Sequence, residues 1–572
     1  MTEPARPQPF FTPRVPRRSL LLGGAAGGLA ALGGGFAVGS EAYAATTPAK
    51  GLGPGGSILP PETRPNPALP AGTDTIPQIE HIVVLMMENH SFDDHLGMLG
   101  RGDGLTLGAN GLPVNYNPDP AGGFVSSFHN PNTCGETDSH ISQGWNTSHI
   151  CWDNGTNMGF VKGCSGAAMG YWTGEDLPFY YSMAGQFPIG DRYFSSVMAQ
   201  TYPNRRFLIA GSAYGNVSTN ASGVSATDAP NGTVFDRLNQ YGISWKDYYP
   251  DIPTAALFLP NFAGNGSHMA GMQQFFTDAA AGTLPSFCLV EPYTQYSEED
   301  NDITIGEAFA SLVVNAVMAS PNWSTTMLVW IYDEYGGWYD HVPPVPAVKP
   351  DNIAPEIQSS DFQAAYDYTG FRVPCCVVSP FAKKDYVSHV VYDHTSVLKL
   401  VETKWNLPAL TFRDANANNM LDFLDLTGAT PAFAEPPRLA APRNPFNGPA
   451  SLPAGSLKNE NDPGFHQICA KLPAGSLPPV ANKLAAKPPN ADSLLAAHLQ
   501  RFVSPAGTPA TPAKTTGSSS GPIIAGVAGA AALVAGGVAL ALRARRRKPD
   551  GNSDEAGGGE DEPEVSSGDQ PD

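Results

Sequence analysis

Basic residues are scarce in this chain. Its 572 residues include 33 Lys and Arg against 53 Asp and Glu, which gives a formal net charge of −20 at pH 7. A surface of this charge repels polyanions, so nucleic acid is not expected as a partner. Cysteine is also sparse, and no two of the seven cysteines have the C-x2–4-C spacing that is typical of structural zinc sites.

The N-terminal end, residues 1–44, is predicted to be a twin-arginine-type export signal. Arg17 and Arg18 precede a run rich in Gly, Ala and Leu, and Ala42-Tyr43-Ala44 provides an A-x-A cleavage site. A general secretory signal is the alternative. In an exported chain a disulfide is favoured over zinc for the three clustered cysteines, with a connectivity that stays open. These are Cys134, Cys151 and Cys164.

Near the other end, residues 523–542 form an uncharged apolar run long enough to cross a lipid bilayer. Basic residues from Arg543 to Lys548 follow it, so the positive-inside rule places the C-terminus in the cytoplasm. We therefore expect an exported protein that is anchored in the cell membrane by this helix, with its main domain outside. The run is rich in Ala and Gly, so partial secretion is the alternative.

Composition divides the chain between these two ends. Pro-, Gly- and Ser-rich stretches mark linkers and stalks, and a short amphipathic helix is expected at Asn490–Phe502. The predicted segments are a linker at 45–75, the main domain at 76–430, a Pro/Ala-rich extension at 431–502, a flexible stalk at 503–522 and a basic then acidic tail at 543–572.

Within the main domain, short apolar runs alternate with helical periodicity. Helices are expected at Ile305–Ala319, where Thr304 and Glu307 have capping-box spacing, and at Thr395–Trp405. Strands are expected at Ile82–Met87, Phe287–Val290, Met327–Tyr332 and Cys375–Ser379. This order of elements predicts an α/β fold with a mostly parallel sheet flanked by helices.

Polar residues follow two of these strands directly. Glu88 and Asn89 come after the first, and Asp333 and Glu334 come after Met327–Tyr332. The carboxyl ends of strands are where ligands bind in open α/β sheets. Carboxylates gathered there are costly without a cation to share, so a metal site is predicted. An ordinary strand with a helix cap, or a solvated acidic turn, is the alternative.

A third segment offers a hydroxyl group. Thr201 precedes Tyr202-Pro203-Asn204-Arg205, a turn that could present a nucleophile, with Arg205 available for a phosphate oxygen. Taken alone, the same residues are compatible with a turn and a helix cap.

Four motifs in this order resemble the bacterial phospholipase C/acid phosphatase family, phosphoesterases with an alkaline-phosphatase-like core. The motifs are ENHSFD, TYPNR, DEYGGWYDHVPP and YDHTSVLKLVE, within residues 79–405. The resemblance implies an α/β sandwich and metal-assisted phosphoryl transfer through a hydroxyl nucleophile.

The resemblance also implies roles for individual residues. Thr201 stands at the position of the nucleophile, and His140 resembles the histidine beside the phosphate. His341 and the Asp393-His394 pair resemble further site residues. Five other histidines are interpreted as surface or structural residues, namely His81, His90, His95, His129 and His389. The residues that resemble metal ligands are Glu88, Asn89, Asp333 and Glu334.

One part of the family pattern is missing. Members usually carry a His-Pro pair shortly before the Gly-Glu of the following helix, whereas this chain has YSEEDNDITIGEAF there. Acidic residues occupy the region instead, namely Glu298, Glu299, Asp300 and Asp302. The departure leaves the pH optimum and the substrate class open.

The expected cofactor is one divalent metal ion. Carboxylates with an amide favour Ca²⁺, and Zn²⁺ tolerates such ligands. In the expected mechanism Thr201 attacks phosphorus, while His140 and Arg205 share the charge that develops on the phosphate oxygens. His341 or His394 then protonates the leaving alcohol.

The expected function is an extracytoplasmic, phospholipase C-like phosphoesterase that acts on a phospholipid or a small phosphate ester. An acid phosphomonoesterase using the same site is the near alternative. A non-catalytic surface binding protein with a degenerate phosphoesterase fold is the distant one, because a site histidine is absent.

Overall fold

The computed structural model describes residues 57–134, 141–219, 228–250, 252–293, 302–428, 430–452 and 483–503. The predicted export signal, the transmembrane segment at 523–542 and the tail lie outside these residues, as does the stalk apart from Val503. Among the helices that are described, none combines the length and the apolar character needed to span a membrane.

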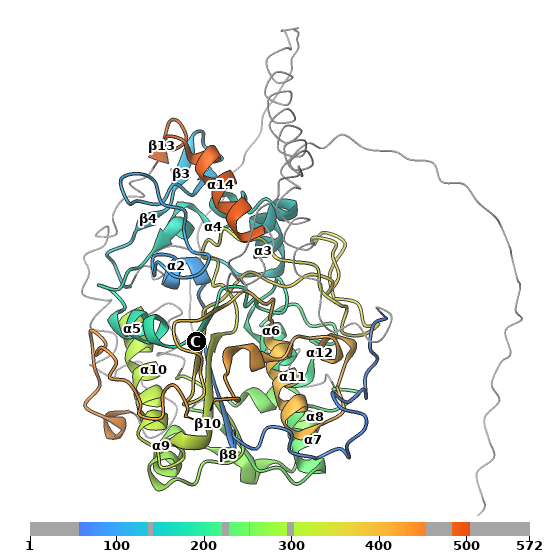
Figure 1. Cartoon of the computed structure of the whole chain (residues 1–572). Coiled ribbons are helices and arrows are strands. Elements are labelled where there is room, and N and C mark those ends of the chain that lie inside the picture. The colour runs from blue at the N-terminus through green and yellow to red at the C-terminus, as the bar shows by residue number, and fades with distance from the viewer. Residues whose placement is uncertain are drawn as a thin grey trace, which may run out of the picture. The chain divides into compact units, whose positions relative to one another are not determined.

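An eight-stranded sheet lies at the centre of the described residues, in the order β12-β6-β11-β10-β1-β9-β7-β8 (Figure 1). All four predicted strands belong to it, as β1, β9, β10 and β11. The strands are β1 His81–Met87, β6 Ile189–Gly190, β7 Trp245–Tyr248, β8 Met269–Ala270, β9 Phe287–Val290, β10 Thr326–Tyr332, β11 Cys375–Val378 and β12 Val387–Ser388.

The sheet is mostly parallel, as predicted. Strands β10, β1, β9, β7 and β8 are parallel neighbours, but β11 pairs antiparallel with both β10 and β6. Two parallel neighbours require a crossover connection that returns the chain to the end of the sheet at which the first strand began. No helix of the described structure lies between β10 and β11, so β11 begins at the end of the sheet at which β10 stops and runs in the opposite direction.

Helices cover both faces of the sheet, as Figure 1 shows. The central strands β1 and β10 are buried along their whole length, which explains their uninterrupted apolar sequences. One face carries α5 Pro178–Gln186, α9 Met272–Ala281 and α10 Ile303–Met318; the other carries α6 Thr201–Ala210, α7 Val234–Gln240, α11 His394–Trp405 and α12 Phe412–Ala415. The predicted α/β fold is confirmed.

The start of α10 differs from the prediction. The side chain of Asp302 caps the helix by accepting a hydrogen bond from the backbone N–H of Thr304. The predicted capping box of Thr304 and Glu307 is therefore wrong. The Glu307 carboxylate instead accepts the backbone N–H groups of Phe179 and Tyr180, which joins α10 to α5.

A smaller lobe lies beyond the carboxyl ends of the parallel strands (Figure 1). The amphipathic helix expected near residue 490 is present there as α14. The lobe contains α2 Phe92–Leu96, α3 Trp145–Trp152, α4 Phe160–Cys164, α14 Ala491–Val503, a sheet of β2 Tyr116–Pro118, β3 Phe124–Ser126 and β13 Lys483–Leu484, and the pair β4 Phe128–His129 and β5 Gly170–Tyr171.

The described part of the predicted linker, residues 57–75, lies along the end of α11. The backbone N–H groups of Gly72 and Thr75 donate to carbonyl oxygens of Trp405 and Lys404. The Asn406 side chain also donates to three carbonyl groups of this stretch. A segment without a helix or a long strand thus satisfies backbone donors and acceptors through α11 and the residue that follows it.

The disulfide predicted within the three-cysteine cluster is wrong. Cys134 is disulfide-bonded, but Cys151 and Cys164 are free thiols. Their sulfur atoms lie 3.4 Å apart between α3 and α4. Sequence spacing grouped the three residues but could not show that Cys134 forms its disulfide outside this group.

Candidate functional site

The register of the central strands brings three acidic residues to one edge of the sheet. Met87 of β1 lies opposite Tyr332 of β10, so the next residues of the two strands, Glu88 and Asp333, are neighbours. Strand β9 also pairs with β1, and Glu291 follows its last residue. Glu291 was not predicted as a site residue, although it too follows an apolar strand directly.

Arg205 joins these three carboxylates. Its side chain is 7% exposed. Nε lies 3.2 Å from Asp333 Oδ2, Nη2 lies 3.1 Å from Glu88 Oε2, and Nη1 lies 3.0 Å from Glu291 Oε2. Burial opposes its charge, but Asp333, Glu88 and Glu291 outweigh burial and raise the pKa of the guanidinium. The sequence predicts that Arg205 contacts a phosphate oxygen. In this arrangement its guanidinium is bound by carboxylates instead.

Thr201 is the first residue of α6 and lies one helical turn before Arg205. Its hydroxyl donates a hydrogen bond of 2.8 Å to Glu88 Oε1. The two oxygens of Glu88 therefore serve Thr201 and Arg205 separately. The structure brings together the predicted nucleophile and two predicted metal ligands, Glu88 and Asp333.

The other two predicted metal ligands form a buried pair. Asn89 Nδ2 donates to Glu334 Oε1 over 2.7 Å, and Glu334 Oε2 accepts the backbone N–H of Gly336. Gly336 has a φ of +65°, and a Cβ at this position would lie 2.1 Å from the carbonyl oxygen of Asn89. Only glycine permits this close approach between the segment that follows β1 and the segment that follows β10.

These residues fit a hard divalent cation. The side-chain oxygen of Asn89 is buried and has no hydrogen-bond partner among the described residues, which is rare for such an atom. Four carboxylates, those of Glu88, Glu291, Asp333 and Glu334, follow strands β1, β9 and β10, and the guanidinium of Arg205 pairs with the first three of them. Oxygen donors with an excess of negative charge are the donor set that Ca²⁺ and Mg²⁺ prefer.

Other side chains of the described structure also form candidate metal-binding groups. Three such groups have potential ligand atoms within 4.8 Å of one another, and the predicted carboxylates are in none of them. The groups are His90, Asp94 and His95; Asp103, His341 and His498; and Asp93, Asp340 and His341.

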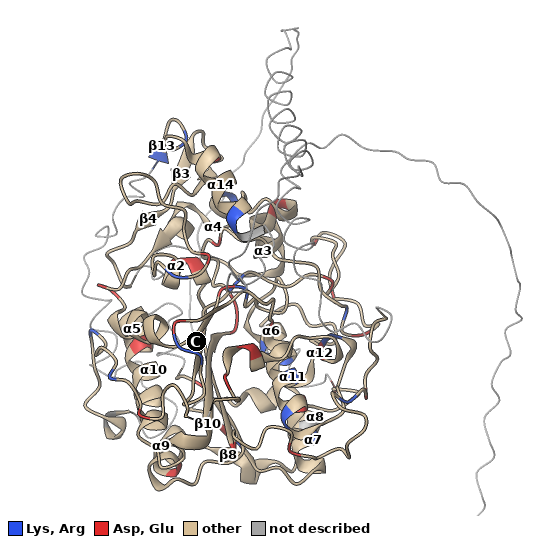
Figure 2. Cartoon of the chain, viewed as in Figure 1, with Lys and Arg blue, Asp and Glu red and all other residues tan. Residues whose placement is uncertain are grey.

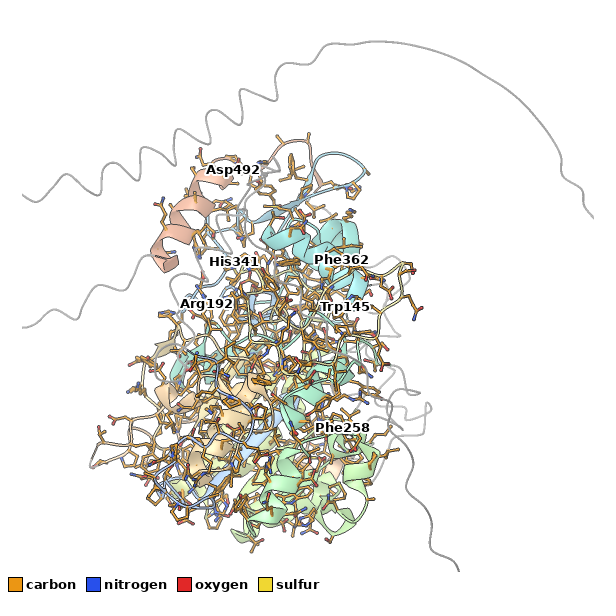
Figure 3. The ribbon with its side chains drawn as sticks, turned by 90° about the vertical axis from the view of Figure 1, so that its right-hand side faces the viewer. Trp145, Arg192, Phe258, His341, Phe362 and Asp492 are labelled. Carbon is orange, nitrogen blue, oxygen red and sulfur yellow. The ribbon has the colours of Figure 1, made fainter. Side chains whose placement is uncertain are left out.

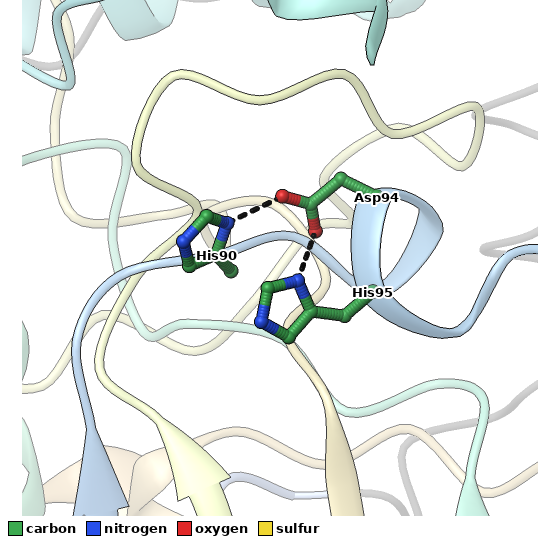
Figure 4. A group of neighbouring side chains, drawn as sticks. All are labelled: His90, Asp94 and His95. Atoms are coloured by element: carbon green, nitrogen blue, oxygen red, sulfur yellow. Dashed lines mark hydrogen bonds and ion pairs between the residues drawn. The ribbon is translucent and has the colours of Figure 1, made fainter. Parts of the chain in front are cut away.

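The first of these groups contains two histidines that the sequence analysis interpreted as structural or surface residues (Figure 4). Nδ1 of His90 lies 2.5 Å from Asp94, and Nδ1 of His95 lies 3.4 Å from it. All three side chains are buried, and the imidazole rings stack with centroids 4.1 Å apart. Burial raises the pKa of Asp94, but the two imidazoles outweigh it and lower the pKa.

His394 lies at the site but is not directed at Thr201. Its Nε2 lies 2.6 Å from the backbone oxygen of Asp333, and its Nδ1 lies 3.3 Å from the Tyr193 hydroxyl. Because a carbonyl only accepts, Nε2 carries a proton. Burial lowers the pKa of His394 to about 4, so the ring is neutral. The arrangement supports a role in holding Asp333 and does not support the predicted protonation of a leaving group.

His341 is held between two carboxylates. Its Nδ1 lies 2.6 Å from Asp93, and its Nε2 lies 3.0 Å from Asp103. Burial lowers the pKa of His341, but the two carboxylates outweigh burial and raise it to about 10. Both nitrogens of this imidazolium are engaged, so the predicted transfer of a proton to a leaving group has no support in this geometry.

The remaining predicted residues divide into two sets. Asp393 caps α11 by accepting the backbone N–H of Thr395, and it also pairs with Arg413 at 3.0 Å. Its role is therefore structural. His140 and the acidic residues Glu298, Glu299 and Asp300 lie outside the described residues.

Comparisons with known proteins identify the family to which the chain is similar. Residues 79–408 match the family described as the Phosphoesterase family. A non-hemolytic phospholipase C from Burkholderia pseudomallei is 30% identical over 410 residues, which cover 61% of this chain and 58% of that protein. A non-specific phospholipase C1 from Arabidopsis thaliana is 32% identical over 378 residues, covering 59% of this chain and 69% of that protein. The chain thus spans less than two thirds of the length of the Burkholderia pseudomallei protein.

A solved structure of a protein in the alkaline phosphatase superfamily from Vibrio parahaemolyticus matches 67% of this chain and 77% of that chain. The sequence identity is 10% and the TM-score is 0.32. The sequence match over residues 79–408 includes β1, α6, β10 and the connections that carry Glu88 and Asp333. The chain therefore belongs to the phosphoesterase family.

Proposed function

We propose that this protein is a metal-dependent, phospholipase C-like phosphoric ester hydrolase with Thr201 as its nucleophile. The observation that carries the proposal is the hydrogen bond from the Thr201 hydroxyl to Glu88, at the sheet edge that also holds Asn89, Asp333 and Glu334. The names of the two phospholipase C relatives favour a phospholipid substrate.

Glu88 prepares Thr201 for attack. The carboxylate accepts the hydroxyl hydrogen atom, which leaves a lone pair of Oγ1 to approach phosphorus, and it is placed to receive the proton. A bond then forms between Oγ1 and phosphorus while the bond from phosphorus to the alcohol oxygen breaks, and the departing alcohol oxygen takes up the proton that Glu88 received. Water subsequently cleaves the threonine ester. From a phospholipid the products are diacylglycerol and a phosphorylated head group.

A divalent cation held by Glu88, Asn89, Asp333 and Glu334 would lower the pKa of the hydroxyl and offset the negative charge of the phosphate. The chain itself supplies the N-terminus of α6, where the backbone N–H group of Thr201 favours an anion. Arg205 holds Glu88, Asp333 and Glu291 in place and reduces their mutual repulsion. We assign to His140 a share of the charge on the phosphate oxygens.

Hydrolysis assays test this function. The purified chain and a Thr201→Ala variant are compared on phosphatidylcholine, a nitrophenyl phosphorylcholine diester and a nitrophenyl phosphate monoester, with and without a chelator. We expect diester cleavage that chelation and the substitution both abolish. Thr277→Ala, an exposed threonine on α9, is the matched control and should retain full activity.

The other outcomes separate the alternatives. Cleavage of the monoester alone would identify an acid phosphomonoesterase. No cleavage of any substrate would favour a binding protein, and full activity of Thr201→Ala would remove the mechanism.

We further propose that the protein is exported and held at the cell membrane through residues 523–542. The proposal rests on the paired arginines of segment 1–44 and on the uncharged apolar run followed by Arg543. Fractionation of cells that express the full chain should place it with the membranes, accessible to protease from outside. Recovery in the cytoplasm would contradict the proposal.

A further inference from the structure

A second cluster of charged side chains lies beside the Thr201 site. Arg372 is fully buried, with Nη2 2.9 Å from Asp93 and Nε 2.9 Å from Asp340. His341 joins Asp93 to Asp103. We call these five residues, Asp93, Asp103, Asp340, His341 and Arg372, the ion network. Figure 2 shows acidic and basic residues together on the connections between the sheet and the smaller lobe.

The ion network joins the two connections that carry the predicted metal ligands. Asp93 belongs to α2, which follows Glu88 and Asn89, whereas Asp340 and His341 follow Asp333 and Glu334. The Ser91 hydroxyl adds a hydrogen bond of 2.7 Å to the backbone oxygen of Tyr339. A displacement within the ion network would therefore alter how the two connections face each other.

Helix α14, near the end of the described chain, reaches this network. His498 is buried, and its Nε2 lies 2.5 Å from Asp103 Oδ1. The neighbouring Leu499 packs against the cluster of Phe194, Val342 and Val345. In Figure 3 the label of Asp492 marks α14, and His341 and Arg192 lie below it. The helix thus contacts the ion network through the polar side chain of His498, and the segment that follows His341 through the apolar side chain of Leu499.

The hydrogen atoms distinguish this contact from a metal site. Nδ1 of His498 lies 3.0 Å from Nη2 of Arg501, which can only donate, so Nδ1 accepts. Nε2 must then carry the proton that it donates to Asp103. A metal ligand would need a bare Nε2 and a proton on Nδ1, opposite the Arg501 donor. The second oxygen of Asp103 pairs with Arg192 at 2.5 Å.

We propose that α14 is a positioning element of the Thr201 site. His498 fixes Asp103, Asp103 fixes His341, and His341 with Arg372 holds the connections that carry the predicted metal ligands in register. His498 is a positioning residue, since its hydrogen bonds reach the ion network and not Thr201. The catalytic consequence rests on the proposed function, whereas the structural consequence does not.

Substitutions of His498 in the full chain test the proposal. His498→Ala removes the hydrogen bond, and we expect kcat to fall about ten-fold with little change in KM, as for other residues that orient ligands indirectly. His498→Gln retains a side-chain N–H donor and should restore most of kcat. Asp492→Asn on the same helix is the matched control, because Asp492 is exposed and contacts Tyr116 and Lys487. It should keep the activity of the unmodified protein.

Amide hydrogen exchange gives a readout that does not depend on activity. In His498→Ala the segment from Asp333 to Val345 should exchange faster than in Asp492→Asn, while β1 is unchanged. If the unmodified protein hydrolyses nothing, the proposed function fails and the exchange result still decides the positioning role. Unchanged exchange in His498→Ala, or equal effects of His498→Ala and Asp492→Asn, would overturn the proposal.

Discussion

At the scale of the residue, Glu88 is the side chain that connects the hydroxyl of Thr201 to the guanidinium of Arg205. Its two oxygens have different partners, at 2.8 Å and 3.1 Å. The chemistry assigned to Thr201 therefore depends on the negative charge of the Glu88 carboxylate as well as on its size and shape.

Replacing Glu88 by Gln keeps the size of the side chain and removes its ability to take a proton. We expect kcat on the phosphorylcholine diester to fall at least about 100-fold, within the range for loss of a general base. Circular dichroism should show an unchanged fold. Glu62→Gln, at a mostly exposed carboxylate, is the control. Activity of Glu88→Gln equal to that of the control would contradict the role of Glu88.

The pKa of His341 predicts how stability changes with pH. Burial opposes its charge, but Asp93 and Asp103 raise the pKa to about 10, against about 6.5 for an unfolded chain. Its contribution to the free energy of unfolding is therefore complete below about pH 6.5 and declines as the pH rises toward 10. Denaturant unfolding of the protein and of His341→Gln should give a difference that is largest near pH 6 and shrinks by pH 10. A difference that grows with pH would contradict this assignment.

Gly336 offers a test of the pair formed by Asn89 and Glu334. Ala at this position would need an unfavourable φ of +65° and a Cβ 2.1 Å from the Asn89 carbonyl oxygen. We expect Gly336→Ala to lower the free energy of unfolding by at least about 1–3 kcal/mol and to weaken metal binding. Gly185→Ala in α5, where a Cβ meets nothing within 4 Å, should cost little. Equal stability of the two variants would show that the connections do not approach this closely.

Single site residues were predictable where they come directly after the end of a predicted strand. Glu88 and Asp333 come directly after apolar runs, and the register of β1 and β10 brings them together. The partners of Arg205 and His341 were not predictable, because each lies at long sequence distance and depends on how loops pack. For His394, the sequence showed an imidazole at the right place but not the carbonyl group that engages it.

At the scale of the element, the apolar runs identified the central strands, whereas the direction of β11 depended on the path of a long connection. The cap of α10 shows the same limit. Thr304 and Glu307 have the spacing of a capping box, but Asp302 caps the helix and Glu307 binds the first turn of α5. Spacing describes what a segment can do alone, and tertiary contacts select among the alternatives.

The packing of α3 against α4, and of β9 and β11 in the sheet, predicts unreactive thiols. Burial raises the pKa of Cys151, Cys288, Cys375 and Cys376, so little thiolate is present near neutral pH. Alkylation of the native protein at pH 8 should leave these residues unmodified, and alkylation after unfolding should modify all four. Rapid native labelling of Cys151 would show that α3 and α4 separate readily.

At the scale of the whole molecule, four carboxylates give the site a concentrated negative charge within an acidic protein. They are those of Glu88, Glu291, Asp333 and Glu334. A cation that binds only the folded state stabilises that state by mass action. We expect a chelator to lower the Tm and an excess of Ca²⁺ or Zn²⁺ to restore it, as followed by scanning calorimetry. Asp333→Asn should reduce this response. A Tm that is indifferent to chelation and to added ions would argue against a bound metal.

The central claim is that Thr201 forms a covalent bond to phosphorus, and mass spectrometry of an acid-quenched reaction tests it most directly. With the phosphorylcholine diester as substrate, the peptide that contains Thr201 should carry a phosphoryl group, with or without its choline substituent, on that residue. The modification should be absent from Thr201→Ala. Turnover of the diester with no modification of Thr201, together with an active Thr201→Ala variant, would contradict the account.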